Sequence, residues 1–254
     1  MAKQRPETEK EEEARVSPKG WESLRGASLG AIETLGLLPM IEAVDAMVKA
    51  ANVEVIRFQK LGLGWTIACV AGGVGAVRVA MEAGHTAADR FSQEGVAASA
   101  ISRIIGGPLP FPPVSSCMLA RPHPTTWDWV SGQTPQATSA TGTALGFAEV
   151  LGFVPAVLAL DAMLKGAMVS FKGYGGIPPR YVLWVQGDVG AVRQAVDAAS
   201  KVASEGNRLV LAQVIARPDA EMAETIPAKF ELAAITGFAL PLPHRLKLLA
   251  PEKD

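Results

Sequence analysis

The sequence predicts an α+β fold made of two tandem domains with the split βαβ, ferredoxin-like topology. Two observations lead to this prediction. The chain contains one long internal repeat, and each copy of the repeat alternates strand-like and helix-like segments in the order β-α-β-β-α-β. In a fold of this class, both helices cover one face of an antiparallel sheet.

The repeat is defined by a nearly constant offset in residue number. The offset is 116 over the first half of each copy and 115 further along, so one residue is missing from the second copy between these blocks. An offset preserved over such a distance indicates a duplicated structural unit. The pairs at these offsets are LGAIETLG at 29–36 with LGFAEVLG at 145–152, Asp45 with Asp161, Lys49 with Lys165, and GVGAVR at 73–78 with DVGAVR at 188–193. Near the end of each copy, ARPH at 120–123 matches ARPD at 216–219 at a shorter offset, because the first copy carries an insertion before this motif.

Each unit begins with a short apolar strand that turns at a glycine into a helix with apolar residues at helical spacing. Two β-rich stretches follow, separated by a loop rich in glycine or proline. A second helix and a last strand that ends at Arg-Pro complete the unit. The predicted elements are strands at 28–33, 53–59 and 65–71 and a second helix at 74–91 in the first copy, and strands at 144–149, 169–174 and 181–186 and a second helix at 189–204 in the second.

The two copies differ in what is attached to them. Twelve charged residues at 1–26 predict a flexible extension with no signal-peptide pattern, because this stretch has almost no apolar surface to bury. The first copy also carries a proline-rich insertion that cannot be regular helix or central strand. The predicted organisation is an extension at 1–26, a first domain at 27–130 with the insertion at about 96–116, a linker at 131–141, a second domain at 142–224 and an apolar C-terminal extension at 225–254.

Composition excludes several classes of function. The formal net charge is −1, with 24 basic and 25 acidic residues, so no overall field favours nucleic acid or an anionic membrane. No predominantly apolar run reaches the roughly 20 residues that span a bilayer. Two cysteines make no disulfide framework, which fits a reducing cytoplasm. We therefore expect a cytoplasmic protein that binds neither nucleic acid nor membrane.

The repeated residues resemble those of the bacterial microcompartment shell domain. The resemblance rests on four motifs: Leu-Gly-x-x-Glu-x-x-Gly, Asp-Ala-Met-x-Lys, Gly-Asp-Val-Gly-Ala-Val and Arg-Pro-His. Two such units in one chain are similar to the tandem-domain, trimer-forming class of shell protein, and the match covers roughly 180 residues. The resemblance implies a homotrimer that mimics a hexagon, with six domains around a central pore.

The same resemblance implies a structural role, as a tile that packs beside hexameric and pentameric shell proteins of a compartment in the cytoplasm. A metabolite-sensing oligomer on the same scaffold is the alternative, since ferredoxin-like folds serve many functions. An enzyme is not expected, because neither repeat displays a distinctive set of acid, base or nucleophile.

Five residues match positions that the family uses at the edge of the tile. Lys49 and Lys165 match its edge lysine, while Arg121 and Arg217 match the arginine beside it and His123 completes the Arg-Pro-His motif. A lysine suits this border because its stem lies on apolar surface while the ammonium reaches carbonyls of a neighbour. The alternative is an ordinary solvated lysine at a helix end.

The loop between the two central strands is where the family places the pore. In the first copy this loop contains Gly62, Leu63 and Gly64, and the resemblance implies that three copies of Leu63 point at the hole. The second copy has an unusual Pro-Pro corner that could hold Arg180 at the mouth, where three guanidinium groups would favour anionic metabolites. A solvent-facing Arg180 is the alternative. The predicted pore residues of this second loop are Ile177, Pro178, Pro179 and Arg180.

No catalytic residue, metal site or cofactor is predicted. His85, His123 and His244 are scattered along the chain, and neither pore loop contains a cysteine. The glycines at 72–75 lack the Gly-Lys-Ser/Thr ending of a phosphate loop, so a tight turn is the expected role. Cys69 and Cys117 are expected to pack as small apolar residues within strands.

Overall fold

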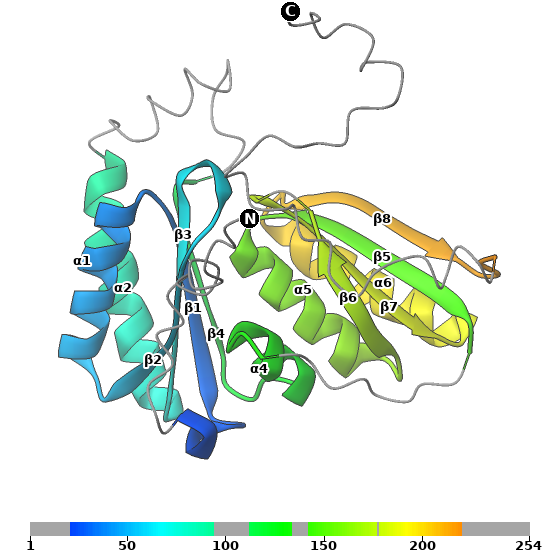
Figure 1. Cartoon of the computed structure of the whole chain (residues 1–254), viewed down its shortest axis with the longest axis horizontal. Helices are drawn as coiled ribbons and strands as arrows, with labels where there is room; N and C mark the ends of the chain where they lie inside the picture. The colour runs from blue at the N-terminus through cyan, green and yellow to red at the C-terminus, as the bar shows by residue number, and fades with distance from the viewer. Residues whose placement is uncertain (1–20, 94–111, 134–141, 177, 220–254) are drawn as a thin grey trace, which may run out of the picture.

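The computed structural model of the chain describes residues 21–93, 112–133, 142–176 and 178–219. It contains two units, each with a four-stranded antiparallel sheet covered on one face by two helices (Figure 1). The predicted α+β class and the order β-α-β-β-α-β are confirmed. Within the described residues, no helix is long and apolar enough to cross a bilayer.

The first unit is built on a sheet in the order β2-β3-β1-β4, and all neighbouring strands are antiparallel. This is the strand order of the ferredoxin-like fold, in which each helix connects two strands that have a third between them. The elements are β1 (Ser28–Leu35), α1 (Leu37–Ala50), β2 (Val53–Lys60), β3 (Trp65–Gly72), α2 (Val74–Gln93) and β4 (Val114–Leu119), with short 3-10 turns at Trp21–Leu24 and Gly62–Gly64.

The second unit repeats this plan with the order β6-β7-β5-β8. Its sheet is also antiparallel throughout. The elements are β5 (Ala144–Leu151), α5 (Phe153–Gly166), β6 (Ser170–Gly175), β7 (Arg180–Gly187), α6 (Val189–Glu205) and β8 (Leu209–Ile215).

The strands extend slightly beyond the predicted ranges. The first strand continues to Leu35 rather than stopping at Glu33, because Thr34 and Leu35 pair with Thr66 and Trp65 of β3. Both first strands end at a glycine with positive φ, where the chain turns into the helix. The hydrophobic pattern therefore located each strand, and the sheet register set its length.

Two local features differ from the sequence-based expectation. Strand β4 begins at Val114, so the last residues of the segment predicted as an insertion, 96–116, belong to the sheet. A further helix, α4 (Pro124–Val130), follows the Arg-Pro-His motif and was not predicted. Proline at its first position and the His123 side chain, which accepts the Thr125 N–H at 3.2 Å, favour a helix start here. Residues 1–20 and 225–254 of the predicted extensions, most of the insertion, Ile177 and the linker residues 134–141 lie outside the described residues. The end of the segment predicted as a flexible extension, 21–26, is instead attached to the fold, because Arg25 pairs with Asp128 at 2.8 Å and Leu24 packs against the apolar cluster.

The repeated glycine in the first strand has a packing role. A Cβ on Gly146 would lie 2.6 Å from Val192 Cγ1 of α6, and a Cβ on Gly30 would lie 2.3 Å from Met81 Sδ of α2. Both distances are too short for any real side chain. The glycine thus allows the second helix of each unit to lie directly on the central strand.

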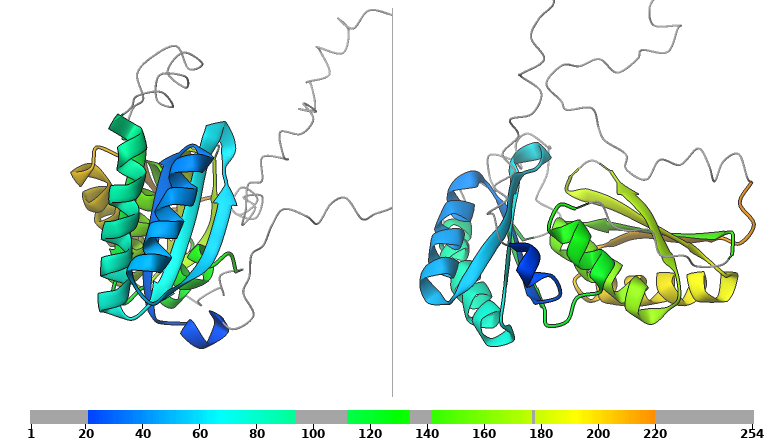
Figure 2. Two further views of the ribbon diagram at one scale, coloured as in Figure 1. Left: turned by 90° about the vertical axis from the view of Figure 1, so that its left-hand side faces the viewer. Right: turned by 60° about the horizontal axis from the view of Figure 1, so that its bottom comes forward.

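The first sheet is buried on both faces. On one face, residues such as Ile32 and Val70 pack against α1 and α2, which lie side by side over the sheet (Figure 2). On the other face, alternate residues such as Ala31 and Cys69 belong to a cluster that continues into the second unit. Helix α5 therefore lies between the two sheets (Figure 1).

Candidate interface and pore site

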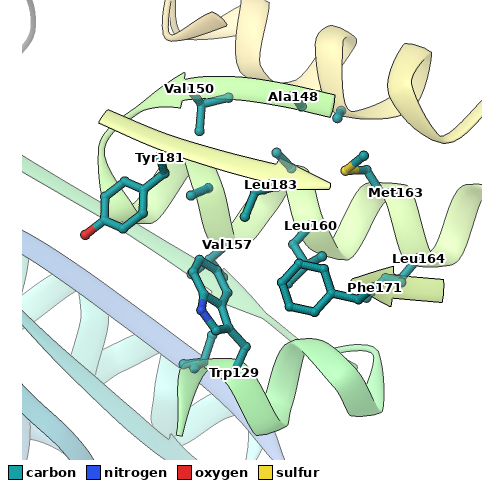
Figure 3. Packing of buried hydrophobic residues seen from close by; sticks show 14 of the residues in the cluster. Trp129, Ala148, Val150, Val157, Leu160, Met163, Leu164, Phe171, Tyr181 and Leu183 are labelled. Carbon is teal, nitrogen blue, oxygen red and sulfur yellow. The ribbon is translucent and has the colours of Figure 1, made fainter. Parts of the chain in front are cut away.

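Helix α5 attaches the second unit to the first. One face of α5 is buried to 7% exposure or less and belongs to the same apolar cluster as Leu29, Ala31 and Cys69 of the first sheet. Part of this cluster, around Trp129, Leu160 and Phe171, is drawn in Figure 3. The buried α5 residues on this face are Phe153, Val154, Val157 and Leu164.

Phe153 is surrounded by groups from three parts of the chain. Its ring centroid lies 5.3 Å from that of Trp129 in α4 and 6.0 Å from that of Tyr181 in β7. The Arg57 guanidinium of β2 lies 5.5 Å above the Phe153 ring and donates to the carbonyls of Trp129 and Val130 at 3.1 and 3.3 Å. A cation over an aromatic face is attractive when both are partly desolvated. Phe153 therefore joins α4, β2 and the second unit.

Glu33 of β1 meets the start of α5 at this interface. Its Oε2 atom accepts the Phe153 N–H at 2.9 Å, and its Oε1 atom has no hydrogen-bond partner among the described residues. The side chain is fully buried. Burial raises the pKa of the Glu33 carboxyl to about 7, although the Phe153 N–H and the charge of Arg208 act in the opposite direction. Glu33 of the first unit thus caps a helix of the second, where an acceptor for a free N–H is stabilising.

The matching face of α1 is not buried. Leu37, Leu38, Ile41 and Val48 are 39%, 58%, 48% and 45% exposed, and they correspond through the repeat to the four buried residues of α5. Single apolar residues are common on protein surfaces, but four large ones on the same helix face form a contiguous apolar patch, which is typical of an interaction site. The chain thus has two equivalent helices in different surroundings. Helix α5 packs against a sheet, whereas no described residue covers the same face of α1.

Glu149 is the counterpart of Glu33, and it has a different partner. Its Oε1 atom pairs with Arg180 Nε at 2.5 Å, and its side chain is 18% exposed. Arg180 stands where the first unit has Trp65, which is buried against Leu35, Leu61 and Leu151. The Arg180 side chain is 55% exposed. The predicted pore-mouth arginine is therefore accessible, with its charge compensated by Glu149.

The two predicted pore loops lie side by side. A Cβ on Gly62 would be 3.9 Å from the Pro178 carbonyl oxygen. Each loop folds onto the glycine that precedes a helix, since the Gly36 N–H donates to the Gly64 carbonyl at 2.8 Å and the Gly152 N–H donates to the Pro179 carbonyl at 2.6 Å. Leu63 has a φ of 57° and is 54% exposed. Ile177, the remaining predicted pore residue, lies outside the described residues.

Two of the predicted edge residues from different units are brought together. The His123 N–H donates to Asp161 Oδ1 at 2.7 Å, and Asp161 Oδ2 accepts from Lys165 Nζ. Burial lowers the pKa of His123, while the charge of Asp161 opposes this effect. The Arg-Pro-His segment of the first unit is thereby fixed to the lysine-bearing end of α5.

The equivalent groups of the other copy are not joined in this way. Lys49 pairs with Asp45 in α1 at 2.6 Å, and both side chains are exposed. Arg121 and Arg217 are also exposed. These residues keep an edge role only as a prediction.

The described residues hold no cluster of three His, Cys, Asp or Glu side chains. Burial raises the pKa of both Cys69 and Cys117 to about 12, so neither thiol ionises near neutral pH.

A cavity of about 480 Å³ lies near the ends of β1 and β3. It contains the polar side chains of Ser28, Asn52 and Glu54, and none of its lining residues is cationic.

Sequence reasoning missed Glu33, Arg57 and α4 as parts of the interface. A signal for Glu33 was present, because both repeats place a carboxylate at the same position of an otherwise apolar strand. No comparable signal exists for Arg57, since Gly173 occupies its position in the second unit.

Comparison with known proteins supports the repeat. The family described as "BMC domain" matches twice, over residues 28–104 and 144–218. The carboxysome assembly protein CcmO of Synechococcus elongatus is 30% identical over 232 residues, which cover 87% of this chain and 76% of CcmO. The carboxysome shell protein CsoS1C of Halothiobacillus neapolitanus is 45% identical over 82 residues, which cover 32% of this chain and 84% of CsoS1C.

A solved structure has a similar fold. The crystal structure of a microcompartment protein from Desulfitobacterium hafniense DCB matches with a TM-score of 0.57 and 27% identity, and the match covers 78% of this chain and 98% of that one.

Proposed function

Because the chain belongs to the BMC domain family and carries two such domains in tandem, we propose that it is a non-enzymatic structural tile of a bacterial microcompartment shell in the cytoplasm. Three copies form a ring of six domains. The ring packs beside hexameric and pentameric shell proteins of the same compartment. Carboxysome shell and assembly proteins among its relatives support this role.

The exposed face of α1 is the observation that carries the proposal. In the second unit, the same face of α5 is covered by the sheet of the unit before it. The second unit's sheet could cover α1 of another copy in the same way. Every unit would then contact one neighbour through its sheet and the other neighbour through its first helix. Such head-to-tail contacts close into a ring when the rotation allows it.

A charge placed on this face of α1 tests the ring. We expect the natural chain to have a mass of about 80 kDa in solution, three times its 26.6 kDa. The variant Ile41→Asp should be a folded monomer at micromolar concentration, because the ring would bury an unpaired carboxylate. Mass photometry and sedimentation velocity measure the difference.

Val79→Asp on α2 is the matched control, since Val79 is also apolar and 47% exposed but lies on another helix. It should leave the trimer intact. A natural chain that stays monomeric, or an Ile41→Asp variant that still forms trimers, contradicts the proposed ring.

The pore belongs to the same proposal. The loops at 62–64 and 178–180 lie beside each other in the chain, so three chains would place six loops around one axis. Leu63 and the Pro178-Pro179 corner would narrow the hole. Arg180 would add a compensated positive charge at its mouth, where a small anionic metabolite would pass.

The edge lysines are tested by assembly. We expect the double variant Lys49→Ala, Lys165→Ala to form trimers but to enter shells with a hexameric partner at less than about a tenth of the natural level, since each edge loses several ammonium contacts. Lys201→Ala, which removes an exposed lysine from α6, is the control. Electron microscopy and quantification of purified shells provide the measurement, and equal incorporation of both variants would rule out the edge role.

A further inference from the structure

The interface inside the chain includes a helix cap that crosses from one unit to the other. Glu33 Oε2 accepts the Phe153 N–H, which is the first N–H of α5. Gly152, just before it, has a φ of 105°, and a Cβ there would lie 2.8 Å from Glu33 Oε2. The glycine therefore makes room for a carboxylate that arrives from another unit.

Helix α1 starts with the same geometry, but no carboxylate of a described residue occupies the corresponding place. Gly36 has φ and ψ of 105° and 153°, and Gly152 has 105° and 148°. Gly36 has no side chain that could cap α1, and the first turn of α1 has no acidic residue. A Cβ on Gly36 would meet only Pro39 within 4 Å among the described residues. The space that Glu33 fills at α5 is thus open at α1, next to the exposed Leu37 and Leu38.

The second unit presents the matching carboxylate on its own sheet. Glu149 corresponds to Glu33 through the repeat, just as Leu37 corresponds to Phe153. Arg180 Nε pairs with one carboxylate oxygen of Glu149, Oε1, at 2.5 Å, and Glu33 likewise uses one of its two oxygens to cap α5. Arg180 therefore orients the carboxylate and leaves its second oxygen for an incoming N–H.

We propose that Glu149 caps α1 of a neighbouring copy of this chain, by accepting the N–H of the partner subunit's Leu37, and that Arg180 positions Glu149 for this contact. The inference rests on the proposed trimer and assigns its specific polar contact. It also separates the two caps chemically. Glu33 is influenced by the charge of Arg208, whereas Glu149 forms a direct ion pair with Arg180 at 2.5 Å, and a carboxylate in an ion pair makes the stronger kind of hydrogen bond.

Variants at both ends of the bond test this contact. Glu149→Ala removes the acceptor. Leu37→Pro removes the donor and is compatible with the first position of a helix, and Gly36 already has the extended ψ that a residue before proline adopts. Leu37→Ala is its matched control, because it shortens the side chain and keeps the N–H. Each full-length variant is studied by sedimentation equilibrium at pH 7.5, with circular dichroism to confirm folding.

We expect Glu149→Ala to weaken each contact about tenfold, which is the usual effect of losing a helix cap or a charge-assisted hydrogen bond. A closed trimer has three such contacts and forms in two association steps, so the three tenfold losses are shared between two steps. The chain concentration at which half of the chains are trimeric should therefore rise by about 30-fold. Leu37→Pro should raise it by a similar factor beyond Leu37→Ala. Glu149→Gln, which keeps an acceptor oxygen, should recover part of the loss, and Arg180→Ala should have a smaller effect than Glu149→Ala.

The double variant Glu149→Ala, Leu37→Pro decides whether the two groups bind each other. If they do, it assembles about as well as the weaker single variant. Additive losses, or an unchanged midpoint in either single variant, overturn the inference while the trimer stands. If the natural chain itself does not form trimers, the proposed function is wrong. Failure of the Glu149 contact and failure of the trimer are therefore distinguishable.

Discussion

Replacing Phe153 by alanine should lower the free energy of unfolding by about 3–5 kcal/mol, the usual range for removing a buried aromatic side chain. Phe153 is 2% exposed and contacts Trp129, Tyr181 and Arg57 at the interface between the two units. The variant would leave a cavity there and remove the ring beneath the guanidinium. Urea denaturation followed by tryptophan fluorescence and by circular dichroism measures the change.

The loss should also separate the two units. In the natural chain we expect the two probes to report one coincident transition, since one apolar cluster spans both units. In Phe153→Ala the transitions should no longer coincide. Val79→Ala on the exposed face of α2 is the control and should change stability by less than about 0.5 kcal/mol. A change below about 1 kcal/mol for Phe153→Ala would show that this interface is not what holds the units together.

The second large effect concerns pH and Glu33. Its pKa is about 7 in the folded chain, against an ordinary value of 4.5. Between these pH values the folded state binds more protons than the unfolded state, so the free energy of unfolding falls as pH rises. The contribution of this group is fully present below pH 4.5 and is lost as pH passes 7, and it amounts to on the order of 3 kcal/mol.

Glu33→Gln isolates that contribution. Glutamine keeps an acceptor for the Phe153 N–H and does not ionise, so the variant should be more stable than the natural chain above pH 7 and nearly equal to it below pH 4.5. Denaturation curves at several pH values between 4 and 8.5 provide the measurement. Glu82→Gln on α2, where the carboxylate is exposed, should follow the natural profile. If the free energy of unfolding varies with pH in the same way for the natural chain and for Glu33→Gln, Glu33 does not titrate near neutral pH.

The fold could be predicted from the sequence because its elements repeat. The same motifs occur twice in the same order, so each weak local pattern had a second, independent example. Helix α4 escaped prediction for the opposite reason. Its sequence, PTTWDWV at 124–130, has no counterpart after the second Arg-Pro, so the repeat gave no second example of it. The helix is seven residues long, and its two tryptophans gain their burial from contacts with distant parts of the chain.

The candidate site was predictable only in part. The family resemblance predicted the pore loops and the edge lysines, and their roles stay predictions. The structure shows only that Gly62 lies near Pro178 and that His123 and Lys165 both bind Asp161. The repeat could not reveal which apolar helix face is covered within the chain. Helices α1 and α5 have equivalent patterns, and only the three-dimensional arrangement distinguishes buried Phe153 from exposed Leu37.

In the proposed ring, the fusion of the two units would create two different kinds of joint. Identical single-domain subunits must use the same contact six times, so any change in that contact alters all six positions at once. Here Ala31 and Cys69 line the seat within the chain, while the larger Phe147 and Trp184 occupy the corresponding positions of the second sheet, 6.5 Å apart between ring centroids. Three joints of the proposed ring would lie within single chains and three would form by association, so selection could tune the strength of the second set without loosening the first.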